Sequence, residues 1–225
     1  MLKKIFTASI VAIAVSGCAS VGTPSESISP VIADNQLVGQ ESKQFDVAFA
    51  KDPYPVVSSV YFEQMDLSNV TIIQPDGSTS ISNRVNRDWE LTDRDVEWLQ
   101  EAYAKAVESS FSASNITVAE SADEADAVVQ ADLTRIKPTA PKDDSSRSPG
   151  SRYYTKYSGE MDVRFTVVQG SETILVIEDR RDAGFDTGTA TMNNRTSVQF
   201  DVRNLFNRWA TGLGAQMEVL PDPEA

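Results

Sequence analysis

Apolar and polar side chains alternate strictly over residues 161–167, and this alternation limits the fold more than any other feature of the chain. A period of two places alternate side chains on opposite faces of a strand, so the segment predicts a half-buried β-strand. Residues 169–172, Gln-Gly-Ser-Glu, then predict a hairpin turn into a second strand over 173–179. The apolar run at 174–177 is typical of a strand covered on both faces.

Four more segments have the composition of strands. Residues 56–65 and 70–73 are rich in β-branched and aromatic side chains, and the group between them suits a turn or bulge. Residues 116–119 are a short strand candidate, and alternation over 127–134 predicts another half-buried strand. Residues 137–152 contain almost nothing apolar and are interpreted as a long loop.

Two helices are predicted from capping residues and apolar spacing. Thr92 is placed to cap the first helix, and Asp95 completes a capping box with it. Apolar residues then recur at three- and four-residue steps from Val96 to Phe111, which gives this helix one apolar face. Ser197 is the predicted cap of the second helix, which Pro221 must end.

These elements predict an α+β fold in a single domain. Because the strands have the spacing of hairpins, we expect a mostly antiparallel sheet of about five to six strands, with the two main helices packed on one face. The folded domain should span residues 45–220, and residues 221–225 should form a tail. A domain of this length can bury a core without disulfides.

The N-terminal residues predict export and lipidation. Lys3 and Lys4 precede an apolar run that is too short to span a bilayer, and residues 1–17 are therefore interpreted as a signal peptide. Small residues lie directly before Cys18, the only cysteine, and resemble the lipobox of bacterial lipoproteins, in which this cysteine is acylated. An ordinary secretory peptide with a chance cysteine is the alternative. Residues 18–44 show no sustained period and are predicted to be a flexible tether.

The residues after the cysteine and the net charge predict a location and the class of partner. Ala19 and Ser20 replace the aspartate that retains lipoproteins in the inner membrane of enteric bacteria, so we expect the periplasmic face of the outer membrane. The whole chain carries a net charge of −13, and removing residues 1–17 takes away two lysines and no acid, which leaves −15. The electric field of such a negatively charged protein opposes the binding of nucleic acid. The expected partners are the membrane, through the lipid, and a periplasmic or outer-membrane protein.

Several structural motifs follow one order along the chain. They are the lipobox at Cys18, the strand containing Tyr61, Trp89 ahead of the first helix, the strand entry Ala125-Asp126-Ala127-Val128, the hairpin around Gly170, and Phe206-Asn207-Arg208-Trp209-Ala210 in the last helix. In this order they resemble a family of uncharacterised bacterial lipoproteins catalogued as domain of unknown function 3313. The resemblance covers most of the chain after the signal peptide. It implies this location and fold, and it implies no activity and no catalytic residue.

The composition excludes most catalytic and metal chemistry. The chain has no histidine and its one thiol is expected to be acylated, which excludes Ser-His-Asp and Cys-His catalysis and the usual zinc ligands. No catalytic residue, metal or cofactor is expected. An enzyme would need a carboxylate pair, as in glycoside hydrolysis, although solvated surface charge is the favoured interpretation of these acids. The candidates are Asp143 with Asp144, Glu160 with Asp162, and Glu178 with Asp179 and Asp182.

Two other groups have both a functional and a structural interpretation. One is a possible calcium loop, for which a plain turn is favoured because the longer, fixed spacing of an EF-hand is missing. Its members are Asp182, Gly184, Asp186 and Gly188. The other is the set of tryptophans, which could stack on a ligand but are interpreted as core residues. They are Trp89, Trp98 and Trp209.

A basic and aromatic cluster is the one local departure from acidity. Its members are Arg147, Arg152, Tyr153, Tyr154, Lys156 and Tyr157. It could contact glycan, lipopolysaccharide or a partner protein. The simpler interpretation is a strand entry whose tyrosines pack and whose cations offset the acids nearby.

The sequence therefore predicts an outer-membrane lipoprotein whose domain is a non-enzymatic interaction or accessory module of the cell envelope. A carboxylate-dependent enzyme acting on envelope glycans would instead need a deep pocket with two facing carboxyl groups. A binder of a small apolar ligand would need an internal cavity of roughly several hundred Å³ between sheet and helices.

Overall fold

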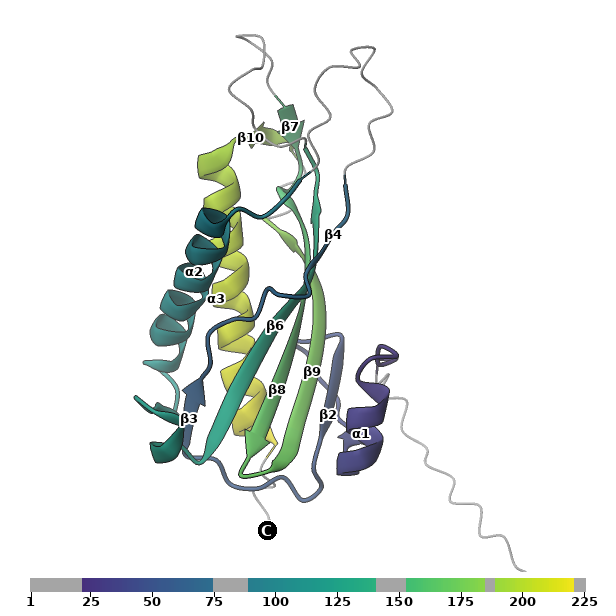
Figure 1. Ribbon diagram of the computed structural model, residues 1–225, viewed down its shortest axis with the longest axis vertical. Coiled ribbons are helices and arrows are strands. Elements are labelled where there is room, and N and C mark those ends of the chain that lie inside the picture. Colours follow the sequence, from purple (N-terminus) through teal and green to yellow (C-terminus); the bar gives the residue numbers. More distant parts are fainter. Residues whose placement is uncertain (1–21, 75–88, 141–152, 185–188, 221–225) are drawn as a thin grey trace, which may run out of the picture.

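One large sheet with helices on both sides makes up the protein, whose structure is a computed structural model (Figure 1). Helices α2 (Asp93–Phe111) and α3 (Arg195–Val219) lie on one face, and α1 (Ser29–Asn35) lies on the other. The α+β class and the placement of the two main helices are as predicted. The structure describes residues 22–74, 89–140, 153–184 and 189–220.

The large sheet contains eight strands within the described residues. In order across the sheet they are β1 (Val38–Gly39), β2 (Val47–Ala50), β9 (Glu172–Ala183), β8 (Gly159–Gln169), β6 (Ala127–Pro138), β3 (Ser59–Phe62) and β5 (Thr117–Val118), and β4 (Thr71–Ile72) also pairs with β6. Strands β7 (Tyr153–Thr155) and β10 (Thr191–Asn193) form a separate two-stranded sheet, and Ala122–Glu124 is a short 3₁₀ helix.

This sheet is larger than the five to six strands predicted, and one edge of it is parallel. Strand β3 runs parallel to β5 and β6, and β4 runs parallel to β6, while the other pairs are antiparallel. The physical reason is that helix α2 connects β4 to β5, and a helical crossover returns the chain in its original direction. The extra strands β1 and β2 are too short to show a period in the sequence.

The predicted hairpin lies at the centre of the sheet. Strands β8 and β9 pair with Gln169 opposite Glu172, and the turn residue Gly170 has φ 62°, a conformation that glycine adopts without strain. Alternate side chains of β8 are buried, and so are those of β6 over the predicted alternation. Residues 174–177 of β9 are all buried, which confirms that this strand is covered on both faces.

Both main helices begin with capping boxes. In α2 the Asp95 N–H donates to Thr92 Oγ1 at 3.3 Å and the Thr92 N–H donates to Asp95 Oδ2 at 3.0 Å, as predicted. In α3 the cap is Asn194, whose Oδ1 accepts the Ser197 N–H at 3.0 Å. The predicted cap at Ser197 is therefore wrong. Ser197 lies inside the first turn, where its hydroxyl accepts the Asn194 N–H at 2.9 Å.

The main core lies between the sheet and the two long helices. Trp209 of α3 is 0% exposed and stacks on Phe206 with ring centroids 5.9 Å apart. Phe206 meets Tyr103 of α2 edge-on at 6.1 Å, and Tyr103 stacks on Phe165 of β8 at 6.5 Å. This series of rings joins both helices to the centre of the sheet and confirms Trp209 as a core residue.

A buried polar contact attaches α3 to β9. Trp209 Nε1 donates to Asp179 Oδ2 at 2.7 Å, and Asp179 is only 3% exposed. Arg181 Nε lies 2.6 Å from the same oxygen, and the Asp46 backbone N–H donates to Asp179 Oδ1 at 3.1 Å. Burial raises the pKa of Asp179, and the Trp209 and Arg181 donors oppose that rise. The carboxyl group thus joins α3, β9 and the residues leading into β2.

The segment predicted to be a flexible tether is folded where the structure describes it, over residues 22–44. Ile28 and Leu37, on either side of α1, are 2% and 7% exposed because they pack on Val47 and Val176 at the outer face of the sheet. The tether prediction is therefore wrong for this range. These isolated apolar residues show no period because the helix between them is short, yet they complete the cover of β9.

Hydrogen bonds also attach this N-terminal segment to the outer face. Ser25 donates to Glu178 of β9 from its backbone N–H at 2.9 Å and from its hydroxyl at 2.6 Å. Arg164 of β8 binds the same carboxylate, with Nη2 at 3.0 Å from Glu178 Oε1. The segment from Ser25 onward is therefore part of the folded domain.

The contact between Trp209 and Asp179 yields a stability prediction. Asp179→Ala leaves the Trp209 indole N–H buried without an acceptor and removes the partners of Arg181 and the Asp46 N–H, so the free energy of unfolding should fall by about 2–4 kcal/mol. Asp179→Asn keeps one oxygen acceptor and should lose about 1 kcal/mol. Urea unfolding measures both, with Asp123→Ala in the exposed 3₁₀ helix as control. A loss in Asp179→Ala no larger than in the control would contradict this role.

Docking of the N-terminal segment yields a second prediction. A Cβ atom on Gly22 would lie 2.9 Å from Val47 Cγ2 and closer still to the Asp46 carbonyl oxygen. Gly22→Ala should therefore weaken the docked state by about 2 kcal/mol and raise thermolysin cleavage before Ile28 or Leu37 roughly 30-fold. Gly214→Ala is the matched control, because its Cβ would meet Phe111 at an ordinary 3.5 Å. Equal cleavage of both variants would show that Gly22 does not hold the segment in place.

Candidate functional site

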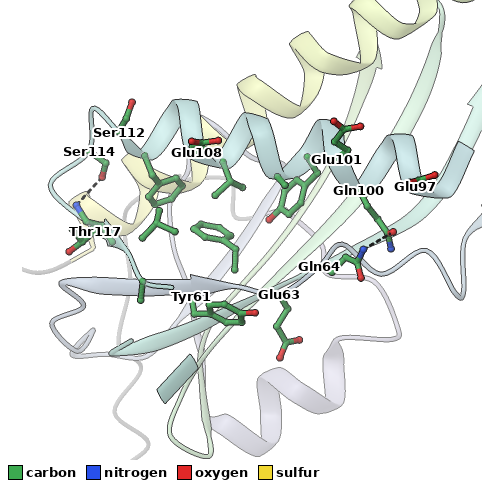
Figure 2. A pocket seen from close by; sticks show the side chains of 18 residues that line it. Tyr61, Glu63, Gln64, Glu97, Gln100, Glu101, Glu108, Ser112, Ser114 and Thr117 are labelled. Atoms are coloured by element: carbon green, nitrogen blue, oxygen red, sulfur yellow. Dashed lines mark hydrogen bonds between the residues drawn. The ribbon is translucent and has the colours of Figure 1, made fainter. Parts of the chain in front are cut away.

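A groove lies between α2 and the edge of the sheet formed by β3 and β5. Its volume is about 800 Å³, and α2 forms one wall from Glu97 to Phe111 (Figure 2). Strands β3 and β5 and the residues that precede β5 form the other wall. Because β5 is the last strand and has only two residues, the sheet gives α2 little cover at this edge. We call this feature the α2 groove.

The floor of the α2 groove is apolar. Phe62 of β3 meets Phe111 of α2 edge-on, with ring centroids 4.9 Å apart, and Ile116 lies beside them in the lining. Val118 of the edge strand is 44% exposed and belongs to the same lining. A partner could therefore bury apolar surface here, at about 25 cal/mol per Å² removed from water.

The rim of the α2 groove is acidic. Glu63 lies on the strand side, and Glu97, Glu101 and Glu108 lie along α2 (Figure 2). Lys105 neutralises one of them, with Nζ 2.5 Å from Glu101 Oε1, and this hydrogen bond holds the pKa of Glu101 below its usual value. In the part of the chain that the structure describes, the other three make no ion pair. Within the described residues, the rim thus carries three carboxylates that no cation pairs with.

Two polar features mark the walls of the groove. Gln64 Nε2 donates to Gln100 Oε1 at 2.8 Å, and Gln100 Nε2 donates to the Met65 carbonyl at 3.1 Å, which ties α2 to the strand side (Figure 2). Tyr103 also contributes to the lining, and its buried hydroxyl has no hydrogen-bond partner among the described residues. Burial raises the pKa of that hydroxyl, so it stays a neutral donor.

A second hollow lies between the sheet and the first turns of α2 and α3. Its volume is about 340 Å³, and its lining includes Trp89 and Trp98. Trp89 Nε1 donates to the Ala140 carbonyl at 2.9 Å, and Trp98 lies under the Arg203 guanidinium at 5.7 Å. Both tryptophans are half-buried and line this cavity, in contrast to Trp209, which is wholly inside the core. This cavity is therefore large enough to hold a small ligand.

Arginines bind both members of one candidate carboxylate pair, Glu160 with Asp162. Arg135 hydrogen-bonds Glu160 and also contacts Asp162, with Nε 3.0 Å from Asp162 Oδ2. Arg180 Nη2 lies 2.9 Å from the same Asp162 oxygen. Ion pairs therefore hold both carboxylates of this pair on the outer face of the sheet.

Among the described residues, the other predicted carboxylates do not form a facing pair either. Glu178 binds Ser25 and Arg164 on the outer face, whereas its neighbour Asp179 binds Trp209 on the inner face, because adjacent residues of a strand point in opposite directions. Asp182 is exposed at the end of β9. Asp143 and Asp144 lie outside the described residues.

The structure offers no support for a metal site in the parts of the chain that it describes. Asp182 and Gly184 of the possible calcium loop are described, but Asp186 and Gly188 are not. Among the described residues, no group of three or more Asp, Glu, His or Cys side chains is arranged to hold a metal ion.

None of the described helices has the length and apolarity that a membrane span requires.

The predicted basic and aromatic cluster is only partly described. Tyr154 of β7 is exposed and lies opposite Met192 of β10, Lys156 is exposed, and Tyr157 is half-buried. Outside the description lie Arg147, Arg152, the side chain of Tyr153, Cys18, residues 1–17 and residues 221–225. The cluster and the lipidation site therefore remain predictions.

Sequence reasoning missed both hollows. No site was predicted from the acids of the α2 groove rim, although Glu97, Glu101 and Glu108 are spaced four and seven residues apart and so share one side of α2. That spacing is the one signal that could have indicated a charged surface. The apolar floor could not be found, because it depends on β3 and β5 lying side by side through parallel pairing.

Comparison with known proteins gives likeness of shape only. No family model and no curated protein matches the chain, so membership in the family of domain of unknown function 3313 stays a prediction. A solved DUF330 protein from Xanthomonas campestris is 11% identical and has a TM-score of 0.39, covering 75% of this chain and 89% of its own. The PelC dodecamer from Paraburkholderia phytofirmans is 9% identical with a TM-score of 0.36, covering 78% and 96%.

A third solved structure, a DUF4136 protein from Bacteroides thetaiotaomicron, is 13% identical with a TM-score of 0.30, covering 82% of this chain and 96% of its own. Identities and TM-scores this low do not indicate a shared activity, partner or assembly. The function must therefore be argued from the chain's own surfaces.

Proposed function

We propose that this chain is a lipoprotein of the bacterial cell envelope, anchored through Cys18, whose domain is a non-enzymatic module that docks a partner protein in the α2 groove. The observation that carries the proposal is the groove itself, which combines an apolar floor with an open sheet edge. Exposed apolar surface of this kind, rimmed by polar residues, marks interaction sites.

The charge of the rim defines the chemistry of the partner. Glu63, Glu97 and Glu108 make no ion pair with any described residue, so the docked segment should carry Lys or Arg around one or two apolar side chains. A second copy of this chain is a poor occupant, because its net charge is also strongly negative. The partner is therefore a different envelope protein with a basic, partly apolar segment.

The carboxylates favour a binding role over the rival enzyme. Glu160, Asp162, Glu178 and Asp179 are each hydrogen-bonded to arginine or tryptophan side chains. A general acid for glycoside hydrolysis needs a raised pKa beside a second free carboxylate in one pocket. Asp179 does have a raised pKa, but its oxygens are engaged by Trp209, Arg181 and Asp46 inside the core.

The docked N-terminal segment fits an anchored domain. Gly22, which packs on Asp46 and Val47, lies only four positions after Cys18, and such a stretch reaches at most about 14 Å. The domain would therefore lie close to the lipid surface, with the anchor leaving from the face that carries α1. The α2 groove is on the helical side of the sheet, so it would stay accessible. Ala19 and Ser20 favour the outer membrane as the site of anchoring.

Site-directed photo-crosslinking tests the docking proposal in intact cells. A benzoylphenylalanine at Ala104, which is exposed in the groove, should capture one envelope protein, whereas the same probe at exposed Phe200 of α3 should not. Glu97→Gln combined with Glu108→Gln should lower the captured yield about fivefold or more, since two rim charges are lost.

The matched control is Glu26→Gln, an exposed acid on the opposite side of the sheet. It should leave the captured yield unchanged. Equal capture at Ala104 and Phe200, or a yield that ignores the Glu97 and Glu108 charges, would refute docking in the α2 groove.

Fractionation tests the anchor separately. Cys18→Ser removes the only thiol that can be acylated, so the protein should move from the membrane to the soluble fraction. Ser20→Ala, two residues away, should stay with the outer membrane. Unchanged fractionation of Cys18→Ser, or mass spectrometry that finds the native thiol unmodified, would disprove lipid anchoring without bearing on the groove.

A further inference from the structure

The cavity between the helix starts is separate from the α2 groove and has a different character. Its floor is formed by Leu99 of α2, Met161 of β8 and Val202 of α3, all of which are buried. Its sides are formed by Trp98 and Val198, which are half-buried. The hollow therefore opens from the surface directly onto the apolar core.

The fold explains why space is left here. Helices α2 and α3 both begin at this end of the molecule, where β6 ends and β8 begins (Figure 1). Ile136 and Pro138 near the end of β6 line one side, and Asn194 and Arg195 at the start of α3 line the other. Side chains from the helices thus approach the sheet from two directions without closing the gap.

Three polar side chains in the lining already have protein partners. Asn193 Nδ2 donates to Thr155 Oγ1 at 3.0 Å, and Asn194 Oδ1 accepts the Ser197 N–H at 3.0 Å. Trp89 Nε1 donates to the Ala140 carbonyl, which turns its ring into the lining and leaves no indole N–H for a ligand. These engaged donors and acceptors do not favour a sugar or a phosphate as occupant.

Charge at the mouth is mixed. Glu90 and Asp95 contribute carboxylates and Arg195 contributes a guanidinium, so neither a cation nor an anion is strongly preferred. Asp95 is also engaged by the capping box of α2. The apolar floor and the aromatic side walls therefore determine which molecules fit.

The volume limits the size of the occupant. A dry apolar cavity of about 150 Å³ in another protein accepts benzene, and cavities of about 300 Å³ or more are typical of small-molecule sites. This cavity, at about 340 Å³, is roughly twice the benzene-sized example. We infer that it binds a neutral, apolar small molecule of roughly ten carbon atoms, either a fused-ring aromatic or a short acyl chain.

Tryptophan signals give a direct test, since the chain has three tryptophans and two of them line the cavity. The purified protein, labelled with ¹⁵N at tryptophan, is titrated with naphthalene. The indole signals of Trp89 and Trp98 should shift and saturate at one equivalent, whereas that of Trp209, bonded to Asp179 in the core, should stay in place. Trp98→Phe assigns the signals. Absence of a saturable shift at both cavity tryptophans would overturn the inference.

Filling the cavity separates specific binding from adsorption to other apolar surface. Val198→Phe adds a ring to the cavity wall and should weaken naphthalene binding at least tenfold, and Val219→Phe, at an exposed site on the same helix, should not change it. Ile136→Phe fills the cavity from the sheet side and replaces Val198→Phe if the latter loses the native Trp209 signal. Binding that survives both fillings would overturn the inference. Decanol should compete with naphthalene in the wild-type protein if the site also accepts acyl chains.

Discussion

Strand β9 is packed on both faces, and the rest of the structure depends on this constraint. On the inner face, Leu175 and Ile177 lie in the core beneath the helices, and Asp179 binds Trp209 of α3. On the outer face, Val176 is covered by the segment around α1. Full burial of one such side chain stabilises a fold by about 1.5–3 kcal/mol, so removing either cover would destabilise the fold. The helical layer and the N-terminal segment are therefore parts of one cooperative unit built on a single strand.

This arrangement determines which surfaces are left for binding. The N-terminal segment occupies the outer face beside β9, and arginine ion pairs occupy the polar positions further along β6, β8 and β9. The α2 groove at the short parallel edge and the cavity at the helix starts remain as hollows with apolar linings. They differ in a way that matters for function, because the groove is open with an acidic rim, whereas the cavity is smaller and reaches the core. A protein segment suits the first, and a small molecule suits the second.

Local signals in the sequence predicted local structure well. The Thr92 and Asp95 pair located the start of α2, and the alternation around Phe165 located β8, because capping and period-two burial depend only on near neighbours. The pairing of strands that are distant in the sequence could not be predicted, since no local pattern shows that β3 lies parallel to β6. The run at 174–177 did predict a cover on both faces, but the cover itself, in residues read as a tether, was missed. The burial of two isolated apolar residues can be inferred only once the strand that they cover is known.

Hydrogen exchange tests most directly whether the N-terminal segment and β9 form one unit. The Ile32 and Leu37 amides donate to the Ile28 and Ile32 carbonyls, and β9 pairs with β2 and β8. If the segment belongs to the fold, these two amides should be protected to nearly the same free energy of opening as those of β9. Exchange of Ile32 and Leu37 at the rate of an unfolded peptide, with β9 still protected, would contradict the account.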